Sequence, residues 1–227
     1  MSMTFEDAAT KSIDVNGTTF VFREIGEKGG IPVVFLHHLT AVLDDWDPRV
    51  VDGLAAKHHV IVFDNRGVGG SGGSTPKTVE EMARDAVAFI GALGFSKVDL
   101  LGFSLGGFIS QVIAQQQPGL VRKIILAGTG PAGGDGIVNV SATLQDAFAK
   151  AGAANKHPKH FLFFTQTSSG QTAADDFLQR LKERTTDLDL PVSNETVQAQ
   201  VAAIQAWGQG DATTLGTVQH PVRRQRR

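Results

Sequence analysis

The amino-acid sequence predicts an α/β fold of three layers (α/β/α), in which helices cover both faces of a mostly parallel β-sheet. The first observation is that short apolar runs alternate with helical patterns between residues 32 and 131. Such alternation implies right-handed crossover connections and a parallel sheet. The second observation is that strand-like runs stop after residue 133, and only helical patterns follow up to residue 210. We therefore expect a parallel-sheet core followed by a helical subdomain.

Composition places the 227-residue chain among ordinary globular proteins. Its formal net charge of -2 predicts no nucleic-acid partner. We also expect no membrane partner, because no apolar run reaches the roughly 18 residues that a spanning helix needs and the N-terminus lacks the apolar core of a secretory signal. The absence of cysteine excludes disulfides and a thiol nucleophile and fits a reducing compartment, so we expect a cytoplasmic protein.

The first 63 residues predict a β-hairpin followed by two buried strands. Residues 11–24 contain two β-rich runs that flank Asn16-Gly17, a dipeptide typical of tight hairpins. Residues 32–36 and 60–63 are continuous apolar runs, as expected for strands that are covered on both faces. A short helix over residues 50–57 is expected to connect these two strands.

A glycine-rich stretch follows the second buried strand. Gly67, Gly69 and Gly72 match the G-x-G-x-x-G pattern of dinucleotide-binding sites. Such a site needs a helix that begins at the last glycine, whereas the next helix start here is Thr78, where Glu81 completes a capping box. We therefore favour a glycine-rich turn over a nucleotide site.

A strand, a sharp turn and a helix place Ser104 at the apex of the strongest local signal. The apolar run at residues 98–101 leads into Gly102-Phe103-Ser104-Leu105-Gly106, and a helical pattern follows. Glycine at positions 102 and 106 leaves room where strand and helix backbones approach closely. This context predicts Ser104 as a nucleophile near the positive end of the helix. A glycine-rich turn with an idle serine is the alternative.

Four motifs together resemble the α/β-hydrolase superfamily. They are the loop after residues 32–36, the D-x-R-G-x-G-x-S turn that starts at Asp64, the Gly-Phe-Ser-Leu-Gly elbow, and Gly-Thr-Gly-Pro at residues 128–131, after a further apolar run. The local sequence of these motifs is similar to that of the serine-esterase and cofactor-free haloperoxidase branch. The resemblance implies a sheet of α/β-hydrolase type and acyl transfer on an ester-like small-molecule substrate, with no cofactor.

The resemblance also implies roles for the residues around Ser104. Ser104 would be the nucleophile, and the backbone N–H groups of Leu39 and Leu105 would form the oxyanion hole. The family usually has glycine where His38 stands, so this side chain could crowd the acyl site. His37 is expected to be a structural residue of the same loop.

Residues 134–210 lie where the resemblance places a helical cap, after a core of residues 1–133. Helical patterns occur at residues 142–151, 160–165, 173–184 and 195–207. The candidate pocket residues, besides His38, are Phe103, Phe161, Phe163, Phe164 and Trp207; packing inside the cap is an equal alternative for the cap aromatics. His157 and His160 are expected at the surface or the pocket rim, and no metal site is expected because no further ligand lies at suitable spacing.

The family pattern breaks after residue 210. Residues 215–222 resemble the start of another core strand, but the chain continues as Arg-Arg-Gln-Arg-Arg at residues 223–227. The order serine, acid, histidine places both later members of a triad beyond this point. We therefore expect an apparently truncated C-terminus, with residues 211–227 a core remnant that carries an aberrant basic tail. A tail that binds acidic lipid or nucleic acid is the alternative.

Two consequences are expected from this break. Catalysis should be weak or absent unless other groups compensate; the candidates are His220 with Asp211, or His157 or His160 with Asp135 or Asp175. The predicted strand at residues 121–127 should keep an unpaired edge, through which the chain could self-associate.

Three classes of function therefore remain open from the sequence. The preferred class is a serine hydrolase of the carboxylic-ester or perhydrolase type, impaired in this chain. The second is a non-catalytic ligand-binding or interaction protein on the hydrolase scaffold, which would bind ligand even without Ser104. The third is a nucleotide-binding oxidoreductase, which NAD(P) would stabilise.

Overall fold

The computed structural model describes residues 3–212, 216 and 222–224 and contains a seven-stranded mixed sheet. The strands are β1 (Lys11–Val15), β2 (Thr18–Ile25), β3 (Val33–Leu36), β4 (Val60–Phe63), β5 (Val98–Phe103), β6 (Val121–Ala127) and β7 (Val222–Arg224). Their order in the sheet is β1-β2-β4-β3-β5-β6-β7. The pairs β1–β2 and β2–β4 are antiparallel, and every pair from β4 to β7 is parallel. The predicted, mostly parallel sheet is confirmed.

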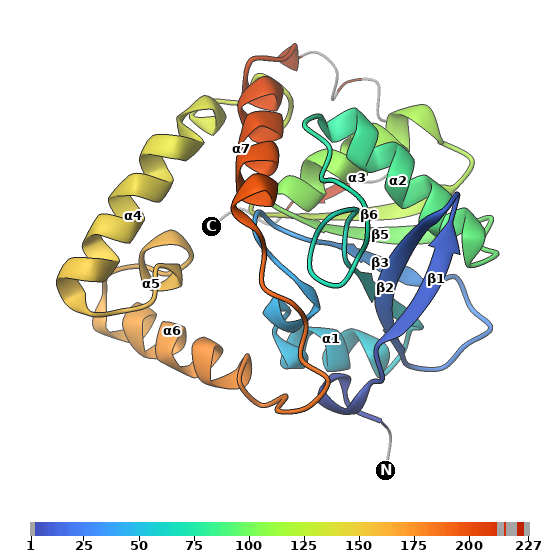
Figure 1. The fold of residues 1–227 in the computed structure, drawn as a ribbon, viewed down its shortest axis with the longest axis horizontal. Coiled ribbons are helices and arrows are strands. Elements are labelled where there is room, and N and C mark those ends of the chain that lie inside the picture. The colour runs from blue at the N-terminus through green and yellow to red at the C-terminus, as the bar shows by residue number, and fades with distance from the viewer. Residues whose placement is uncertain (1–2, 213–215, 217–221, 225–227) are drawn as a thin grey trace.

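Helices lie on both faces of the sheet, which gives the predicted three layers (Figure 1). The α-helices are α1 (Pro48–Ala55), α2 (Val79–Ala92), α3 (Leu105–Gln116), α4 (Val140–Ala154), α5 (Lys159–Leu162), α6 (Ser168–Arg180) and α7 (Asn194–Gly208), and the 3-10 helices are η1 (Phe5–Asp7), η2 (Leu43–Asp45) and η3 (Ile137–Asn139). α2 and α3 cover one face, and α1 covers the other. Among the described helices, none combines the length and apolar character needed to cross a lipid bilayer.

The central strands are buried on both faces, as their continuous apolar sequences predict. In β3, Val34 and Leu36 pack with α2 and α3, whereas Val33 and Phe35 pack in a second cluster with α1. Side chains alternate between the faces of a strand, so a strand covered on both sides needs an apolar residue at every position.

Local sequence signals account for the ends of several elements. Asn16 and Gly17 have φ values of 54° and 81°, the left-handed conformations that a two-residue hairpin turn requires. The hydroxyl of Thr78 accepts a hydrogen bond from the amide of Glu81 at 3.2 Å, which caps α2. Asp47 caps α1 in the same way, and Pro48 occupies its first turn.

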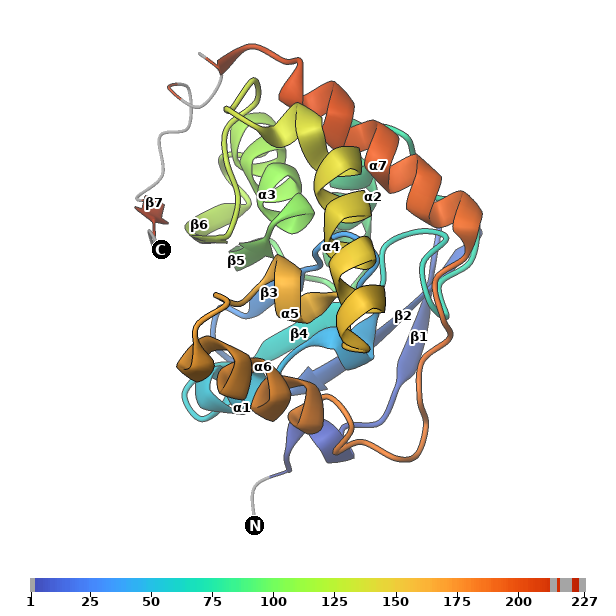
Figure 2. The same cartoon turned by 90° about the vertical axis from the view of Figure 1, so that its left-hand side faces the viewer.

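Helices α4 to α7 form the predicted helical segment beside the carboxyl ends of the parallel strands (Figure 2). Three ion pairs fasten this segment to the chain after β3: Lys159 with Asp45, Arg180 with Asp47, and Arg184 with Asp44. The last helix, α7, also joins the main hydrophobic core through Ala203, Ile204 and Trp207. A boundary at residue 133 remains a prediction, because α7 packs on the core as well as on η3 and α4 of the cap.

Strand β7 corrects one expectation about the C-terminal region. Val222–Arg224 run parallel to Ile124–Leu126 of β6, so this part of β6 does not have the unpaired edge that the sequence predicted. Two arginines of the predicted basic tail therefore belong to a strand, because ladder hydrogen bonds come from backbone groups and tolerate any side chain. The face of β6 with Ile125 stays open, and this side chain is 39% exposed. His220 lies outside the described residues.

Candidate active site

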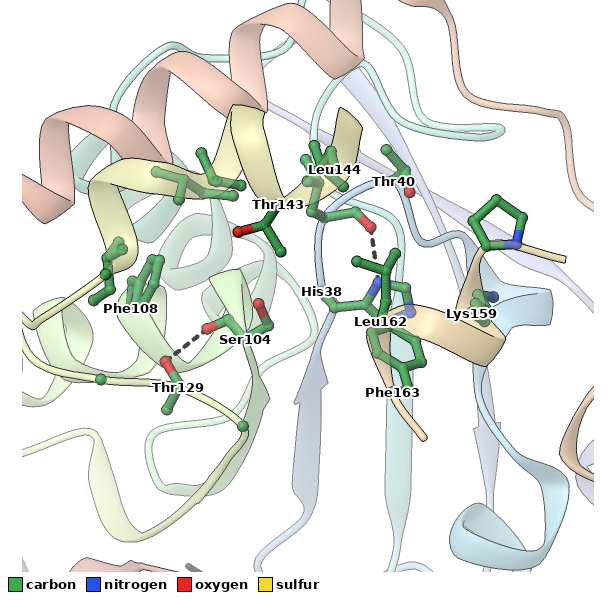
Figure 3. Close-up of a pocket in the computed structure, with 18 of the residues that line it drawn as sticks. His38, Thr40, Ser104, Phe108, Thr129, Thr143, Leu144, Lys159, Leu162 and Phe163 are labelled. Carbon is green, nitrogen blue, oxygen red and sulfur yellow. Dashed lines mark hydrogen bonds between the residues drawn. The ribbon is translucent and has the colours of Figure 1, made fainter. Parts of the chain in front are cut away.

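Ser104 occupies the turn between β5 and α3 in a backbone conformation that non-glycine residues rarely adopt. Its φ and ψ are 52° and -114°. Such a conformation costs on the order of 1–3 kcal/mol and persists only where the surroundings hold it. Here the Ser104 amide donates to Ala127 O at 2.9 Å, and the Thr129 hydroxyl donates to Ser104 O at 2.8 Å (Figure 3). The turn is therefore fixed from the neighbouring strand.

Two glycines allow the backbones around this turn to come together. A Cβ atom at Gly102 would overlap the carbonyl oxygen of Gly106 and the hydroxyl of Ser110. A Cβ atom at Gly106 would overlap the carbonyl oxygen of Leu36 at the end of β3. The carbonyl oxygens of Gly106 and Leu36 are backbone atoms that cannot swing away, so glycine is required by close packing at both positions.

Two backbone amides near Ser104 are free to bind an oxyanion. Leu105 is the first residue of α3, where an amide has no intrahelical acceptor. Leu39 lies in the loop after β3 and lines the same cavity as Ser104. Within the described part of the chain, neither of these amides donates a hydrogen bond. Amides without an acceptor can stabilise negative charge on a bound oxygen, so both are candidates for an oxyanion hole.

A cavity of about 840 Å³ lies over Ser104, between the strand ends and the cap (Figure 3). Its core side includes His38, Leu39, Thr40, Ser104, Phe108 and residues 128–131. Its cap side is mainly apolar and includes Ile137, Val140, Leu144, Phe148, Leu162 and Phe163. The volume and the few polar groups are typical of a small-molecule site. Phe148 is 60% exposed and marks the open side of the cavity.

Four aromatic residues predicted for the pocket do not line this cavity. Phe103 packs edge-on against His38, with ring centroids 5.1 Å apart, and Trp207 stacks behind the wall on Phe108 at 5.2 Å. Phe161 lies next to His160, and Phe164 packs on Phe177 inside the cap. The helical periodicity of the sequence does not distinguish residues that line the cavity from residues that pack inside the cap, since both sets are apolar. Phe163 does line the cavity, and sequence reasoning missed Phe108, Leu144, Phe148 and Leu162.

His38 belongs to the cavity wall and binds its own loop. Its Nδ1 lies 2.7 Å from the carbonyl oxygen of Leu39, so Nδ1 carries the proton that is donated. Its ring packs edge-on against Phe103 and Phe163. Burial, together with the charge of Lys159, lowers the pKa of His38 from 6.5 to about 4, so the ring is neutral at pH 7.

The other end of the cavity is polar and is formed by Asp45, His157 and Lys159. Lys159 of α5 pairs with Asp45 of η2. Burial alone would raise the pKa of Asp45, but the neighbouring ammonium outweighs it and holds that pKa below its ordinary value. Burial and the charge of Lys159 lower the pKa of His157.

No histidine of residues 3–212 forms a hydrogen bond with the Ser104 hydroxyl. His160 is buried in the cap, with Nε2 3.3 Å from the Asp175 carboxylate. His37 is buried beneath the loop, with Nε2 3.6 Å from the Asp64 carboxylate. Among the described residues, Asp135 forms no pair with His157 or His160, and the predicted pair of His220 with Asp211 stays a prediction, because His220 lies outside these residues.

The glycine-rich loop after β4 holds two carboxylates. The amide of Gly70 donates to Asp64 at 3.2 Å and to Asp189 of the cap at 2.9 Å. A Cβ atom at Gly69 would meet both carboxylates. Burial and the nearby Asp189 raise the pKa of Asp64 well above its ordinary value. The Gly70 amide is thus already bound to carboxylates and does not offer a free donor to a phosphate. Among the described residues, no three His, Asp or Glu side chains group as metal ligands.

A family model described as alpha/beta hydrolase fold matches residues 31–215. An alpha/beta hydrolase fold protein from Chitinophaga pinensis has a similar structure, with a TM-score of 0.87 and 40% identity over 97% of this chain and 79% of that chain. The enol-lactonase from Burkholderia xenovorans has a similar fold, with a TM-score of 0.66 and 21% identity over 93% of this chain and 79% of that chain.

Among curated relatives, the non-heme chloroperoxidase of Streptomyces lividans is 33% identical over 118 residues. This alignment covers 51% of the present chain and 43% of the chloroperoxidase. The matched segment therefore spans less than half the length of that relative.

Proposed function

The chain belongs to the α/β-hydrolase fold family, and we propose that it is a serine hydrolase that acts on ester-like small molecules. The observation that carries the proposal is the setting of Ser104. Its strained turn presents the side chain to a cavity of about 840 Å³, next to the free amides of Leu39 and Leu105. Strain of this kind gathers at functional sites, where the surrounding structure maintains it.

The proposed reaction is acyl transfer in two steps. The Ser104 oxygen attacks the ester carbonyl carbon, its proton passes to a base, and the carbonyl oxygen takes up the negative charge between the Leu39 and Leu105 amides. The alcohol then leaves with a proton, and water releases the acid from Ser104. In the perhydrolase variant, which the similarity to a non-heme chloroperoxidase favours, hydrogen peroxide replaces water and a peracid leaves.

The proposed reaction needs a general base that accepts the proton of the Ser104 hydroxyl. His38 and His157 line the cavity, but neither forms a hydrogen bond with the Ser104 hydroxyl, and burial lowers the pKa of both rings, which weakens them as bases. Loss of the histidine of a serine–histidine–acid triad costs on the order of 10⁶ in rate in other enzymes. We therefore expect slow turnover, with a small-molecule substrate as the partner.

The substrate proposal follows from the polarity of the cavity. An apolar acyl group suits the side formed by Val140, Leu144 and Leu162, and the polar end with Lys159 suits a more polar part of the same molecule. The name of the structurally similar enol-lactonase adds cyclic esters to the candidates.

A non-catalytic ligand-binding protein is the second candidate. The observation that favours it is that no described histidine bonds to Ser104, although the cavity is intact. Such a protein would keep its ligand affinity after Ser104→Ala, whereas a hydrolase would lose turnover.

Covalent labelling by a fluorophosphonate separates the two candidates. The sample should first be shown to be folded by near-UV circular dichroism, and Ser104→Ala is the control. Labelling that is confined to Ser104 supports the hydrolase. A folded protein that is not labelled but binds an apolar fluorescent probe in the cavity supports the binding protein.

A further inference from the structure

Gln200 of the cap reaches the loop that carries Leu39. It lies on α7 and is only 1% exposed. Its side-chain oxygen accepts a hydrogen bond from the amide of Thr40 at 2.8 Å. This bond joins two segments that are 160 residues apart in the sequence. A fully buried polar side chain aimed at one backbone amide has a specific structural task.

The peptide group between Leu39 and Thr40 is held from both sides. Its carbonyl oxygen, on Leu39, is bound by Nδ1 of His38 at 2.7 Å, and its N–H, on Thr40, is bound by Gln200. Because a peptide group is planar and rigid, two bonds on opposite edges fix its orientation. Thr40 has a φ of 63°, a conformation that a β-branched residue adopts only when its surroundings impose it.

We propose that Gln200 is a positioning residue for the oxyanion hole: together with His38 it fixes the Leu39–Thr40 peptide, and so keeps the adjacent Leu39 amide directed at the cavity. The inference rests on the proposed function for the role of the Leu39 amide. It gives His38 a task at a position where the family resemblance leads one to expect glycine. The cap is then part of the catalytic geometry as well as a wall of the cavity.

Helix α7 also contacts α3, the helix that begins with the other proposed oxyanion donor. Trp207, two turns further along α7, stacks on Phe108 of α3 with ring centroids 5.2 Å apart. α3 begins at Leu105, which is the other oxyanion donor. Helix α7 therefore contacts the segments that carry both amides: Trp207 packs on Phe108 of α3, and Gln200 binds the loop that carries Leu39. A displacement of α7 would separate them.

The test compares three variants of the whole chain. Gln200→Leu removes the acceptor at similar size, Gln200→Glu keeps an acceptor oxygen, and Gln205→Leu is the matched control. Gln205 lies on the same helix, but its amide donates to the Ser141 hydroxyl of α4 at 3.0 Å and not to the loop. If Gln200→Leu does not fold, Gln200→Met takes its place.

The first readout is amide hydrogen exchange by NMR, which needs no activity. We expect the Thr40 amide to exchange at least tenfold faster in Gln200→Leu, while the amides of β5 keep their rates. Gln200→Glu should restore slow exchange, and Gln205→Leu should leave it unchanged. Equal Thr40 exchange in the wild-type protein and Gln200→Leu would overturn the inference.

The second readout is the rate of fluorophosphonate labelling. For Gln200→Leu we expect the rate at saturating reagent to fall about 100-fold, the order that a misplaced catalytic group costs, with reagent affinity changed less than threefold. An unchanged labelling rate in a variant with fast Thr40 exchange would overturn the positioning role. If the wild-type protein is not labelled, the proposed function fails, and the exchange rates alone decide whether Gln200 fixes the loop.

Discussion

Gly106 of α3 packs directly against the carbonyl oxygen of Leu36, and a Cβ atom at position 106 would overlap that oxygen. Leu36 is the last residue of β3, three residues before Leu39, and Gly106 follows Leu105. The loop and the helix that provide the two free amides are therefore joined by a backbone contact. The spacing of these amides depends on the absence of a side chain at position 106.

Gly106→Ala tests this contact. We expect a loss of about 3 kcal/mol in the free energy of unfolding, because the added methyl group forces the backbones of β3 and α3 apart. Urea denaturation measures the loss. The control is Gly152→Ala in α4, where a Cβ atom meets nothing and alanine should stabilise the helix by up to about 1 kcal/mol. Equal stability of Gly106→Ala and wild type would show that the contact is not tight.

The pair of Arg180 and Asp47 predicts how firmly the cap is attached. Both nitrogens of the guanidinium fork reach the carboxylate, at 2.9 and 2.6 Å, and both side chains are largely buried. We expect Arg180→Met to lower the free energy of unfolding by about 2 kcal/mol, the size of a hydrogen-bonded charged pair.

The control for this pair is Lys150→Met. Lys150 pairs with Asp146 on the exposed face of α4, where an ion pair contributes less than about 0.5 kcal/mol. Limited proteolysis of the linker between α6 and α7 should accelerate in Arg180→Met and not in Lys150→Met. Similar effects of the two substitutions would contradict a special role for the buried pair.

Burial of His38 predicts a pH dependence of stability. Its pKa is lowered from 6.5 to about 4 in the folded state, so between these values the unfolded chain binds more protons than the folded chain. His38 therefore contributes a loss of stability as the pH falls from 6.5 toward 4. Urea denaturation across this range should show a smaller loss for His38→Gln, because glutamine does not titrate.

His38→Gln must be compared with the wild-type protein, because Asp64 changes the stability in the opposite direction as the pH falls. The raised pKa of Asp64 gives stability that is present at low pH and lost as the pH rises through its folded value. This contribution is shared by the wild-type protein and His38→Gln and cancels in their difference. Parallel pH profiles for the two proteins would contradict the prediction for His38.

The cavity predicts a preference for the length of the acyl group. Leu144 lines the cap side, and Leu144→Trp should fill part of its volume of about 840 Å³. We expect labelling by a long-chain fluorophosphonate to slow at least tenfold, while a short-chain reagent reacts at an unchanged rate. Competition between the two reagents measures the preference. Equal slowing of both would mean that the substitution disturbs Ser104 and not the acyl site.

The open face of β6 predicts self-association. Ile125 is 39% exposed beside the exposed Arg122 and Lys123, and β7 covers the edge of this strand but not its face. We expect a concentration-dependent increase in sedimentation coefficient that Ile125→Lys reduces. Val138→Lys, at a similarly exposed apolar residue of η3, is the control and should have no effect. A monomer at every concentration would contradict this proposal.

Several features of the fold could be predicted because they depend on neighbours in the chain. The Asn16-Gly17 turn and the Thr78 cap are local: a positive φ or a capping hydroxyl is needed within a few residues. The alternation of apolar runs and helical patterns predicted the parallel sheet, because each run and each pattern is formed by residues that are close in the chain. Pocket residues were harder, since Phe163 and Phe164 are adjacent in sequence but only Phe163 faces the cavity.

The sequence by itself determined the strand–turn–helix that carries Ser104, because close backbone approach demands glycine at fixed spacing on both sides of it. Only the tertiary structure decided which cap residues meet the core. The bond of Gln200 to Thr40 and the convergence of Asp64 and Asp189 on Gly70 join segments more than 100 residues apart. Side-chain hydrogen bonds over such separations leave no periodic pattern in the chain, so no local signal could have located them.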